Sequence, residues 1–265
     1  MNRVQALKDP SSQPMAQAGQ PDHYSYQHYA DPDIAAGFDA LRFGGPIGTM
    51  LLEEQERVLE GFVGDVAGLT VIDVGTGTGR AALALARRGA RVTGVDASVE
   101  MLKVAEIRAG EAGLQIVFAP GDAHALAFGD RSFEIAVCLR VLMHAPDWKR
   151  CLAELCRVAS RRIVFDYPAL FSVAAFQAAG RRVAQAAGRR VEAYRVLSAR
   201  SVARELERSG FRITARHRQF VLPIACHKLV GMPRATRCVE GALARIGLLR
   251  LAGSPVTVVA ERCGS

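Results

Sequence analysis

The residues that most directly suggest chemistry are an apolar run followed by a glycine-rich segment. Val71–Val74 leads into Gly75-Thr76-Gly77-Thr78-Gly79. Glycines let the backbone turn tightly and leave room for a ligand against the main chain, and a helix that begins after them offers unpaired N–H groups. A dinucleotide-binding loop has the spacing G-x-G-x-x-G, which would require glycine at position 80, but this chain has Arg80 there. The segment therefore predicts a nucleoside-type ligand with a different loop spacing.

Besides Asp73, near the end of the first expected strand, two more carboxylates lie where the next two strands are expected to end. Asp96 lies in Gly94–Ser98, 21 residues after Gly75, and Asp122 lies in Pro120–Ala123. A carboxylate after the second strand can accept hydrogen bonds from both ribose hydroxyls of an adenosyl group, and Asp122 could meet the adenine amino group. Each acid alone could instead cap a helix or a turn. Their recurrence at successive strand ends favours an adenosyl site.

The elements that must position these residues alternate along the chain. Short β-rich runs and helical runs follow one another from Leu69 onward, a pattern typical of a parallel sheet covered by helices. We expect strands at 70–74, 91–95, 115–119, 133–139, 162–165, 212–222 and 256–261. We expect helices at 53–62, 80–88, 99–112, 147–158 and 201–209, with a turn at 44–46 before the first of them.

The chain divides into three parts. Residues 1–22 have the composition of a disordered leader, without the apolar core of a secretory signal. Residues 23–64 are expected to form an N-terminal helical lid, in which Tyr24, Tyr29 and Phe43 cover the ligand or pack in the core. Residues 65–265 are expected to form one sheet domain, with helical embellishments at 169–198 and 227–254.

Charge is distributed unevenly along the 265 residues. Residues 1–150 hold 14 Lys and Arg against 19 Asp and Glu, a net charge of −5, and residues 151–265 hold 20 against 7, a net charge of +13. Such asymmetry can mark a surface for an anionic membrane, an acidic substrate or nucleic acid, or it can be a solvated basic face. Arginine pairs repeat at 178–185 and 186–193, and arginines mix with apolar residues at 227–254. Both regions could rest on a membrane surface or form a lid.

The cysteine spacing and the length of the apolar runs bear on where in the cell the protein is expected. The six cysteines show no CxxC pair, which favours a reduced cytoplasm. No apolar run approaches the ~18 residues of a membrane-spanning helix. We expect a cytoplasmic protein, with peripheral contact to the inner face of the membrane if the basic half binds lipid. No His or Cys cluster has metal-ligand spacing, so no metal is expected.

These motifs together resemble those of class I S-adenosylmethionine-dependent methyltransferases. The closest group contains the ubiquinone- and menaquinone-biosynthesis methyltransferases (methyltransferase type 11). The resemblance rests on Asp73–Gly79, Gly94–Ser98 and Gly121–Ala123, with residues 132–138 and 141–145 similar to the fourth strand and its loop. It covers residues ~65–168 and is specific to the superfamily. One departure is Val158–Arg162, which replaces the usual Pro-Gly-Gly turn and predicts a tighter, basic loop.

The resemblance implies a fold and a cofactor. The fold is a Rossmann-like, doubly wound, mostly parallel seven-stranded sheet with helices on both faces, an antiparallel last strand and a helical insertion after the fifth strand. The cofactor is S-adenosyl-L-methionine, released as S-adenosyl-L-homocysteine. By resemblance, Asp73 orients the methionine ammonium, Asp96 binds the ribose, and Met101 packs on the adenine or in the core. The expected cofactor-binding residues are Asp73, Gly75, Thr76, Gly77, Gly79, Asp96, Ala97, Met101, Asp122, Ala123 and Leu139.

Residues that could assist methyl transfer are expected at the carboxyl ends of the fourth and fifth strands. The sulfonium is an activated donor, so the protein must chiefly align the acceptor and exclude water. His144 could remove a proton or could cap the next helix. Arg140 could hold a substrate carboxylate or phosphate, or lie on the surface. Asp166 or Tyr167 could face the acceptor.

We therefore expect an enzyme that methylates O, N or C of a small acceptor, lipophilic or anionic. A non-catalytic adenosyl-binding regulator and an RNA methyltransferase are alternatives, although no RNA-binding module is recognisable. An NAD-dependent oxidoreductase is disfavoured because the last glycine is Gly79. No Asn/Asp-Pro-Pro-aromatic or Pro-Cys motif follows the fourth strand, so neither amino methylation of bases nor cytosine carbon methylation has its signature, and no DNA partner is expected.

Overall fold

The computed structural model describes residues 37–39, 43–186 and 194–264. The leader at 1–22, together with Tyr24 and Tyr29 of the expected lid, lies outside these residues, so those predictions stay open. The second arginine pair of the repeat, at 189–190, also lies outside them. The architecture below concerns the described part of the chain.

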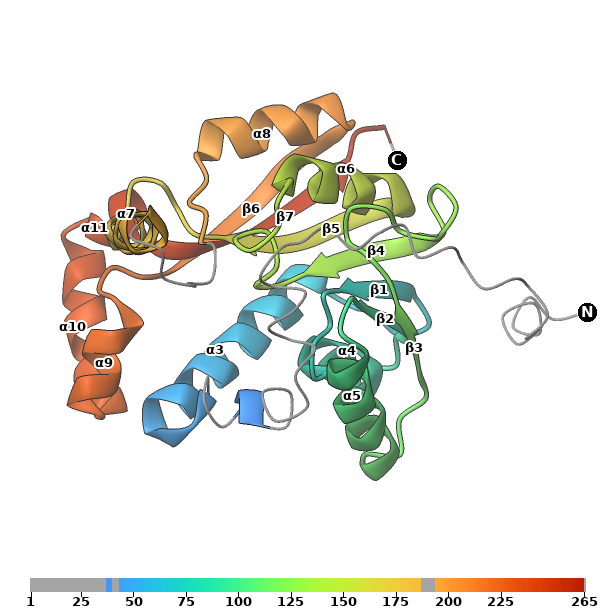
Figure 1. Ribbon diagram of the computed structural model, residues 1–265, viewed down its shortest axis with the longest axis horizontal. Coiled ribbons are helices and arrows are strands. Elements are labelled where there is room, and N and C mark those ends of the chain that lie inside the picture. Colours follow the sequence, from blue (N-terminus) through green and yellow to red (C-terminus); the bar gives the residue numbers. More distant parts are fainter. Residues whose placement is uncertain (1–36, 40–42, 187–193, 265) are drawn as a thin grey trace, which may run out of the picture.

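Seven strands form one mixed sheet in the order β3-β2-β1-β4-β5-β7-β6 (Figure 1). The strands are β1 (Thr70–Val74), β2 (Arg91–Asp96), β3 (Ile116–Pro120), β4 (Phe133–Cys138), β5 (Ala159–Tyr167), β6 (Phe211–Phe220) and β7 (Ser254–Arg262). β1 to β5 pair in parallel, whereas β7 is antiparallel to both β5 and β6. The expected sheet with an antiparallel last strand is confirmed. Chain order reverses beside β1, where β4 follows, and ligands bind at such a point in open α/β sheets.

Helices cover both faces of the sheet, as expected. Figure 1 shows α3 (Gly45–Val63), α4 (Arg80–Arg87) and α5 (Val99–Glu111) on one face, and α6 (Trp148–Val158) and α8 (Ala199–Arg208) on the other. The remaining helices gather at one end of the molecule: α7 (Val173–Ala186), α9 (Ile224–Val230), α10 (Pro233–Arg245) and α11 (Leu248–Ala252). These four helices lie outside the two helical layers that cover the sheet, and we call them the added helices.

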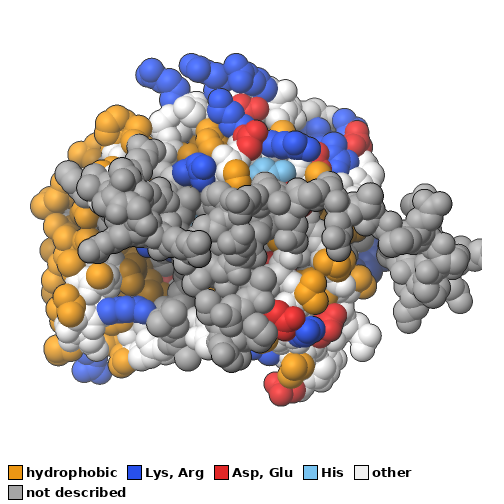
Figure 2. All heavy atoms as spheres, viewed as in Figure 1, with side chains coloured by type: hydrophobic (Ala, Val, Ile, Leu, Met, Phe, Trp, Pro, Cys, Tyr) orange, Lys and Arg blue, Asp and Glu red, His pale blue; other side chains and the backbone are white. Residues whose placement is uncertain are grey.

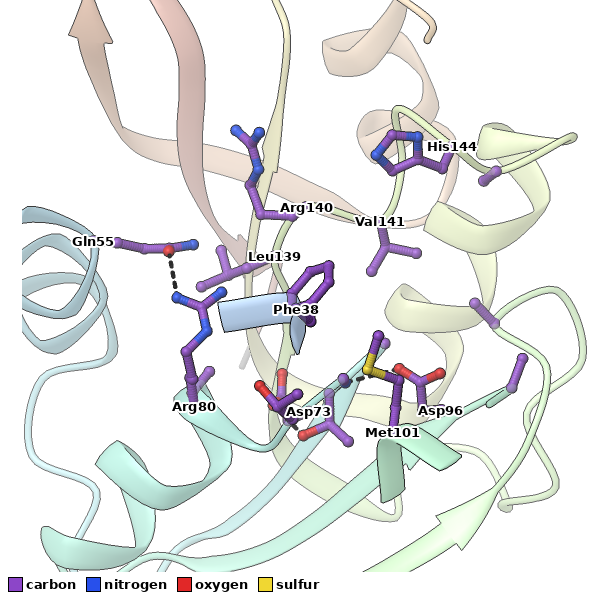
Figure 3. Close-up of a pocket in the computed structure, with 18 of the residues that line it drawn as sticks. Phe38, Gln55, Asp73, Arg80, Asp96, Met101, Leu139, Arg140, Val141 and His144 are labelled. Atoms are coloured by element: carbon purple, nitrogen blue, oxygen red, sulfur yellow. Dashed lines mark hydrogen bonds between the residues drawn. The ribbon is translucent and has the colours of Figure 1, made fainter. Parts of the chain in front are cut away.

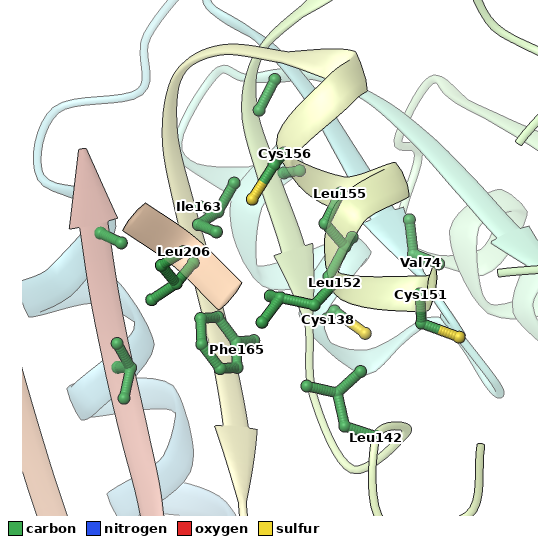
Figure 4. Close-up of a cluster of buried hydrophobic side chains, with 14 of the residues drawn as sticks. Val74, Cys138, Leu142, Cys151, Leu152, Leu155, Cys156, Ile163, Phe165 and Leu206 are labelled. Carbon is green, nitrogen blue, oxygen red and sulfur yellow. The ribbon is translucent and has the colours of Figure 1, made fainter. Parts of the chain in front are cut away.

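Alternation along the strands divides the apolar residues between two cores. Successive side chains of a strand point to opposite faces, so Val71 packs with Leu59 of α3 and Leu85 of α4, while Ile72 and Val74 belong to the core under α6 and α8. Figure 4 shows this second core, in which side chains of α6 and α8 meet those of β5. A strand buried on both faces carries apolar residues toward both, which explains why Val71, Ile72 and Val74 are all apolar.

Three cysteines are part of the second core. Cys138, Cys151 and Cys156 are buried free thiols. Burial raises the pKa of Cys151 and of Cys156 to about 12, because the thiolate would lose its hydration. These cysteines therefore act as small apolar side chains rather than as nucleophiles.

Two sequence expectations are corrected at α3 and β5. The turn expected at 44–46 is the start of α3, since proline is compatible with the first helical turn. The expected basic loop at 158–162 does not form, because α6 passes directly into β5 at Ala159. Arg162 lies within β5 instead, where its guanidinium donates to the carbonyl of Val63 at 2.7 Å and to Glu261 at 2.5 Å. It thus satisfies a carbonyl at the end of α3.

Two absences concern the described residues only. Within them, none of the helices combines the length and hydropathy that crossing a bilayer requires. The same part of the chain holds no group of three or more His, Cys, Asp or Glu side chains arranged to coordinate a metal ion. The expectation that no metal is required stays a prediction.

Candidate functional site

The glycine loop between β1 and α4 is shaped by close backbone contacts. Gly75, Gly77 and Gly79 have φ angles of 71°, 54° and 82°, in the region that favours glycine. A Cβ on Gly75 would lie 2.2 Å from Cγ2 of Val141, so the absent side chain lets the loop after β4 approach. A Cβ on Gly77 would meet nothing within 4 Å. Gly75 therefore serves packing, and Gly77 faces open space.

Asp73 is a buried carboxylate at the end of β1. It is 2% exposed, and Thr76 Oγ1 donates a hydrogen bond to its Oδ2 at 2.7 Å. Burial raises the pKa of Asp73 to about 6, an effect that the Thr76 hydroxyl opposes and the nearby Asp96 reinforces. The unpaired charge of this carboxylate makes the site attractive to a cation.

Asp96 connects the first two loops of the sheet. Its Oδ2 accepts the Gly77 N–H at 2.8 Å, and its Oδ1 accepts the Ser98 N–H at 2.9 Å. Burial raises the pKa of Asp96, while these backbone donors act in the opposite direction. Each carboxylate oxygen has two lone-pair sites, so one bond to each leaves both oxygens able to accept a further donor. A vicinal diol presents two such donors.

These residues line a cavity at the carboxyl ends of the strands. The empty space within it is about 1240 Å³, a volume that includes open solvent at its mouth. In Figure 3, Asp73, Asp96 and Met101 lie at one end, Arg140 and His144 lie at the other, and Phe38 lies between them. The carboxylates of Asp73 and Asp96 thus lie at the opposite end of the cavity from Arg140 and His144.

The structure brings most of the expected site residues to this cavity. The expected site residues among those that line it are Asp73, Gly75, Thr76, Gly77, Asp96, Ala97, Met101, Ala123, Leu139, Arg140 and His144. Gly79, Asp122 and Asp166 are not among the lining residues. Gly79 serves helix packing, because a Cβ there would lie 2.9 Å from Ala105 and from Leu83.

Asp122 binds its neighbour rather than lining the cavity. Its Oδ1 accepts the backbone N–H of His124 at 2.8 Å and lies 2.7 Å from His124 Nδ1. His124 Nε2 lies 3.3 Å from the backbone nitrogen of Asp147, which donates to it. The Nε2 is thus the acceptor, and the proton resides on Nδ1. The His124 side chain, held by these two contacts, lies at the cavity wall.

Asp166 positions Arg140 from the end of β5. Arg140 has a φ of 66°, which a residue other than glycine adopts at a cost of about 1 kcal/mol or more. Its backbone N–H donates to Asp166 Oδ1 at 2.5 Å, and its Nη1 lies 3.9 Å from Asp166 Oδ2. Because Asp166 is 2% exposed, this contact is desolvated. Tyr167, the other acceptor-facing candidate, is buried in the second core.

His144 lies in the loop between β4 and α6. It is 8% exposed and lines the cavity, and its ring centroid is 6.2 Å from that of Tyr194. It does not cap the next helix. The N-cap of α6 is Asp147, whose side chain accepts the backbone N–H groups of Lys149 and Arg150.

The segment before α3 adds contacts that the sequence did not reveal. Asp39 accepts a hydrogen bond from Thr78 Oγ1 at 3.1 Å, lies 3.5 Å from Arg80 Nε, and pairs with Arg108. The Arg80 guanidinium also lies 3.7 Å from the ring centroid of Phe43. Since no periodicity or spacing connects Asp39 with residues 39 and 69 positions away, only the fold brings them together.

Residues 72–162 match the family of methyltransferase domains. The chain is 39% identical over 133 residues to a ubiquinone biosynthesis O-methyltransferase of Idiomarina loihiensis, covering 47% of this chain and 55% of that protein. It is 41% identical over 83 residues to the enzyme of the same name from Stutzerimonas stutzeri, covering 31% of this chain and 36% of that protein. The matches thus span about half or less of these relatives.

Solved structures share the fold over most of the chain. Magnesium protoporphyrin IX methyltransferase from Synechocystis PCC 6803, solved with bound SAH, has a TM-score of 0.62 at 20% identity and covers 89% of this chain and 99% of that one. A geranyl diphosphate methyltransferase in complex with GPP and sinefungin has a TM-score of 0.60 at 16% identity, with coverage of 79% and 77%. At such identities the likeness shows the fold alone.

The close approach at Gly75 generates a stability prediction. Gly75→Ala should lower the free energy of unfolding by more than Gly113→Ala, because both positions have positive φ but only the first Cβ would strike a neighbour. The φ change alone should cost about 1–2 kcal/mol, and the contact with Val141 should add to it. Urea unfolding of both variants measures the difference. Equal losses would contradict the packing role assigned to Gly75.

Proposed function

We propose that this protein, whose residues 72–162 match the family of methyltransferase domains, transfers a methyl group from S-adenosylmethionine to O, N or C of a small-molecule acceptor. The observation that carries the proposal is the Asp96 carboxylate, held by the Gly77 and Ser98 N–H groups beside a large cavity. This arrangement supports recognition of a ribose, with Asp73 supplying charge for an amino group.

The donor set of the cavity fits such a cofactor. Asp96 retains acceptor capacity for two hydroxyls, and the open side of Gly77 leaves room for the ligand. The buried Asp73 would hold an ammonium group, because its ionised form gains a partner there. Met101 and Ala97 would form an apolar wall for the adenine.

The chain's own residues would serve the acceptor. When bound, S-adenosylmethionine supplies a methyl group already activated by its sulfonium. Arg140 and His144, at the far end of the cavity from Asp96, would orient the acceptor. His144 could take a proton from an attacking hydroxyl or amine. Asp166 would keep Arg140 in place through the backbone bond at 2.5 Å. Phe38 would help to exclude water.

We also propose that the protein contacts the inner face of an anionic membrane from the cytoplasm. Seven of its large exposed apolar side chains belong to residues 224–252: Leu229, Val230, Met232, Val239, Ile246, Leu248 and Leu251. Figure 2 shows apolar side chains gathered on the side where α9, α10 and α11 lie in Figure 1. We call this surface the α9–α11 face. An apolar surface of this kind marks an interaction site.

The charge of the α9–α11 face favours contact with a lipid bilayer over a basic face that is exposed only to solvent. Lys228, Arg234, Arg237, Arg245 and Arg250 are exposed on the same helices. The acid within them, Glu240, is buried and accepts hydrogen bonds from the backbone of Val221 and Leu222. Apolar side chains beside cationic ones match the interface of a membrane with anionic headgroups.

The cofactor proposal predicts selective binding. S-adenosylmethionine and S-adenosylhomocysteine should bind the wild type in calorimetry, and NAD should not. Asp96→Ala should weaken binding of both by about 1–3 kcal/mol through lost charge-assisted hydrogen bonds. Asp130→Ala is the matched control, because Asp130 is an exposed acid paired with Arg157. Tight NAD binding, or an unaffected Asp96→Ala variant, would count against the assignment.

Asp73 predicts a pH dependence of cofactor binding. Its carboxyl has a pKa raised to about 6, so protonation below that value removes the charge that attracts the ammonium. The affinity of S-adenosylmethionine should therefore increase as the pH rises from about 5 to 7. Asp73→Asn should bind weakly and lose this increase, because its amide cannot ionise. A wild-type affinity that stays constant over this range contradicts the role of Asp73.

The membrane proposal predicts lipid-selective sedimentation. The protein should sediment with vesicles that contain phosphatidylglycerol more than with vesicles of phosphatidylcholine alone, and added salt should reduce this binding. Leu229→Glu and Ile246→Glu should weaken it by removing apolar contact and adding like charge. Ile107→Glu, at a 62% exposed position on α5, should have little effect. Absence of binding at every salt concentration would eliminate the proposal.

A further inference from the structure

A second cavity adjoins the first through shared walls. Its empty space is about 720 Å³ including open solvent, and Arg140 and His144 line both cavities. Its other lining residues are Val173, Ala174, Arg181, Tyr194, Phe220, Val221, Leu222, Pro223, Ile224, Ser254 and Pro255. They come from α7, from the segment before α8, from the end of β6 and from the start of β7. The space thus lies between the covered sheet and the added helices.

Positive charge is concentrated in this second cavity. Two arginines line it, and the described lining residues include neither Asp nor Glu. The guanidinium of Arg181 lies 4.9 Å from the ring centroid of Tyr194, a cation–π distance that orients it. Asp166 orients Arg140, because it accepts the Arg140 backbone N–H and its Oδ2 lies 3.9 Å from Arg140 Nη1. Arginine held in a fixed direction presents its donors to a carboxylate or a phosphate in matching geometry.

Apolar residues form a second part of the wall, beside the polar side chains of His144, Tyr194 and Ser254. Val173, Leu222, Pro223, Ile224 and Pro255 form much of it, and Phe220 adds an aromatic ring. Sites for small molecules combine such a wall with a few polar groups that fix orientation. The arginines and the apolar side chains together favour a ligand that has an anionic group attached to an apolar body.

We propose that the second cavity binds the methyl acceptor, and that this acceptor carries a carboxylate or phosphate on an apolar body. The inference rests on the proposed function and names its substrate class. Arg181 binds the anionic group together with Arg140. The apolar body packs on the wall around Leu222 and Ile224. The accepting atom points to the boundary that Arg140 and His144 share with the first cavity.

Calorimetry with simple probes tests the proposal on the full chain. Benzoate and phenyl phosphate are the anionic probes, and benzamide is the neutral isostere of benzoate. With S-adenosylhomocysteine present, at least one anion should bind about tenfold or more tightly than benzamide, since hydrogen bonds between charged partners contribute about 1.5–3 kcal/mol. The preferred anion identifies the head group.

Variants of Arg181 separate site binding from general charge attraction. Arg181→Gln should abolish the preference for the anion, and Arg181→Lys should retain part of it because it keeps the charge but not the planar fork. Arg208→Gln on α8, which removes an exposed arginine paired with Glu205, should change nothing. The affinity for S-adenosylhomocysteine should stay the same in all three variants.

Two results overturn the inference while leaving the proposed function intact. One is equal binding of benzoate, phenyl phosphate and benzamide by a protein that binds S-adenosylhomocysteine normally. The other is an anion preference that survives Arg181→Gln. Failure of the wild type to bind S-adenosylhomocysteine would instead refute the proposed function itself.

Discussion

The site depends on one carboxylate that accepts backbone hydrogen bonds from two loops. Asp96 receives the N–H of Gly77 in the first loop and the N–H of Ser98 in the second. The carboxyl ends of β1 and β2 are neighbours because the two strands pair in parallel, with Asp73 opposite Gly94. Burial of an ionised group is costly unless donors satisfy it. These backbone donors stabilise the charge and leave acceptor capacity for a ligand.

The loop after β4 is the second constraint, because it separates the two cavities. Val141 occupies the space that a side chain on Gly75 would fill, so this loop and the glycine loop must be close. One residue earlier, Arg140 has a left-handed backbone conformation stabilised by Asp166 of β5. Such strain persists when surrounding contacts compensate for it. The ends of β4 and β5 therefore determine the position of Arg140 at the boundary between the two cavities.

The uneven charge along the chain corresponds to a difference between the two cavities. The acidic first 150 residues contribute Asp73 and Asp96 to the first cavity, and the basic remainder contributes Arg181 to the second. An ammonium-bearing cofactor and an anionic acceptor would each meet complementary charge. In the proposed arrangement, the α9–α11 face would adjoin the acceptor cavity at Ile224, the first residue of α9.

Local pattern in the sequence was sufficient for the parallel strands and for Asp73 and Asp96, which line the first cavity. Strand alternation and glycine spacing are encoded within a few residues, so β1 and the loop from Gly75 to Gly79 could be located to the residue. Because parallel strands end at one edge, Asp73 and Asp96 could also be placed together.

Tertiary structure alone decided the contacts between distant segments. Asp39 with Arg108, and Arg181 with Tyr194, follow no period or spacing. Asp122 contacts His124, because the imidazole Nδ1 lies within hydrogen-bond distance of its carboxylate. Arg162 donates to the Val63 carbonyl because the end of α3 packs beside β5, a partner that the strand pattern does not specify. Sequence pattern records which face a residue prefers, but the partner it meets depends on how whole elements pack.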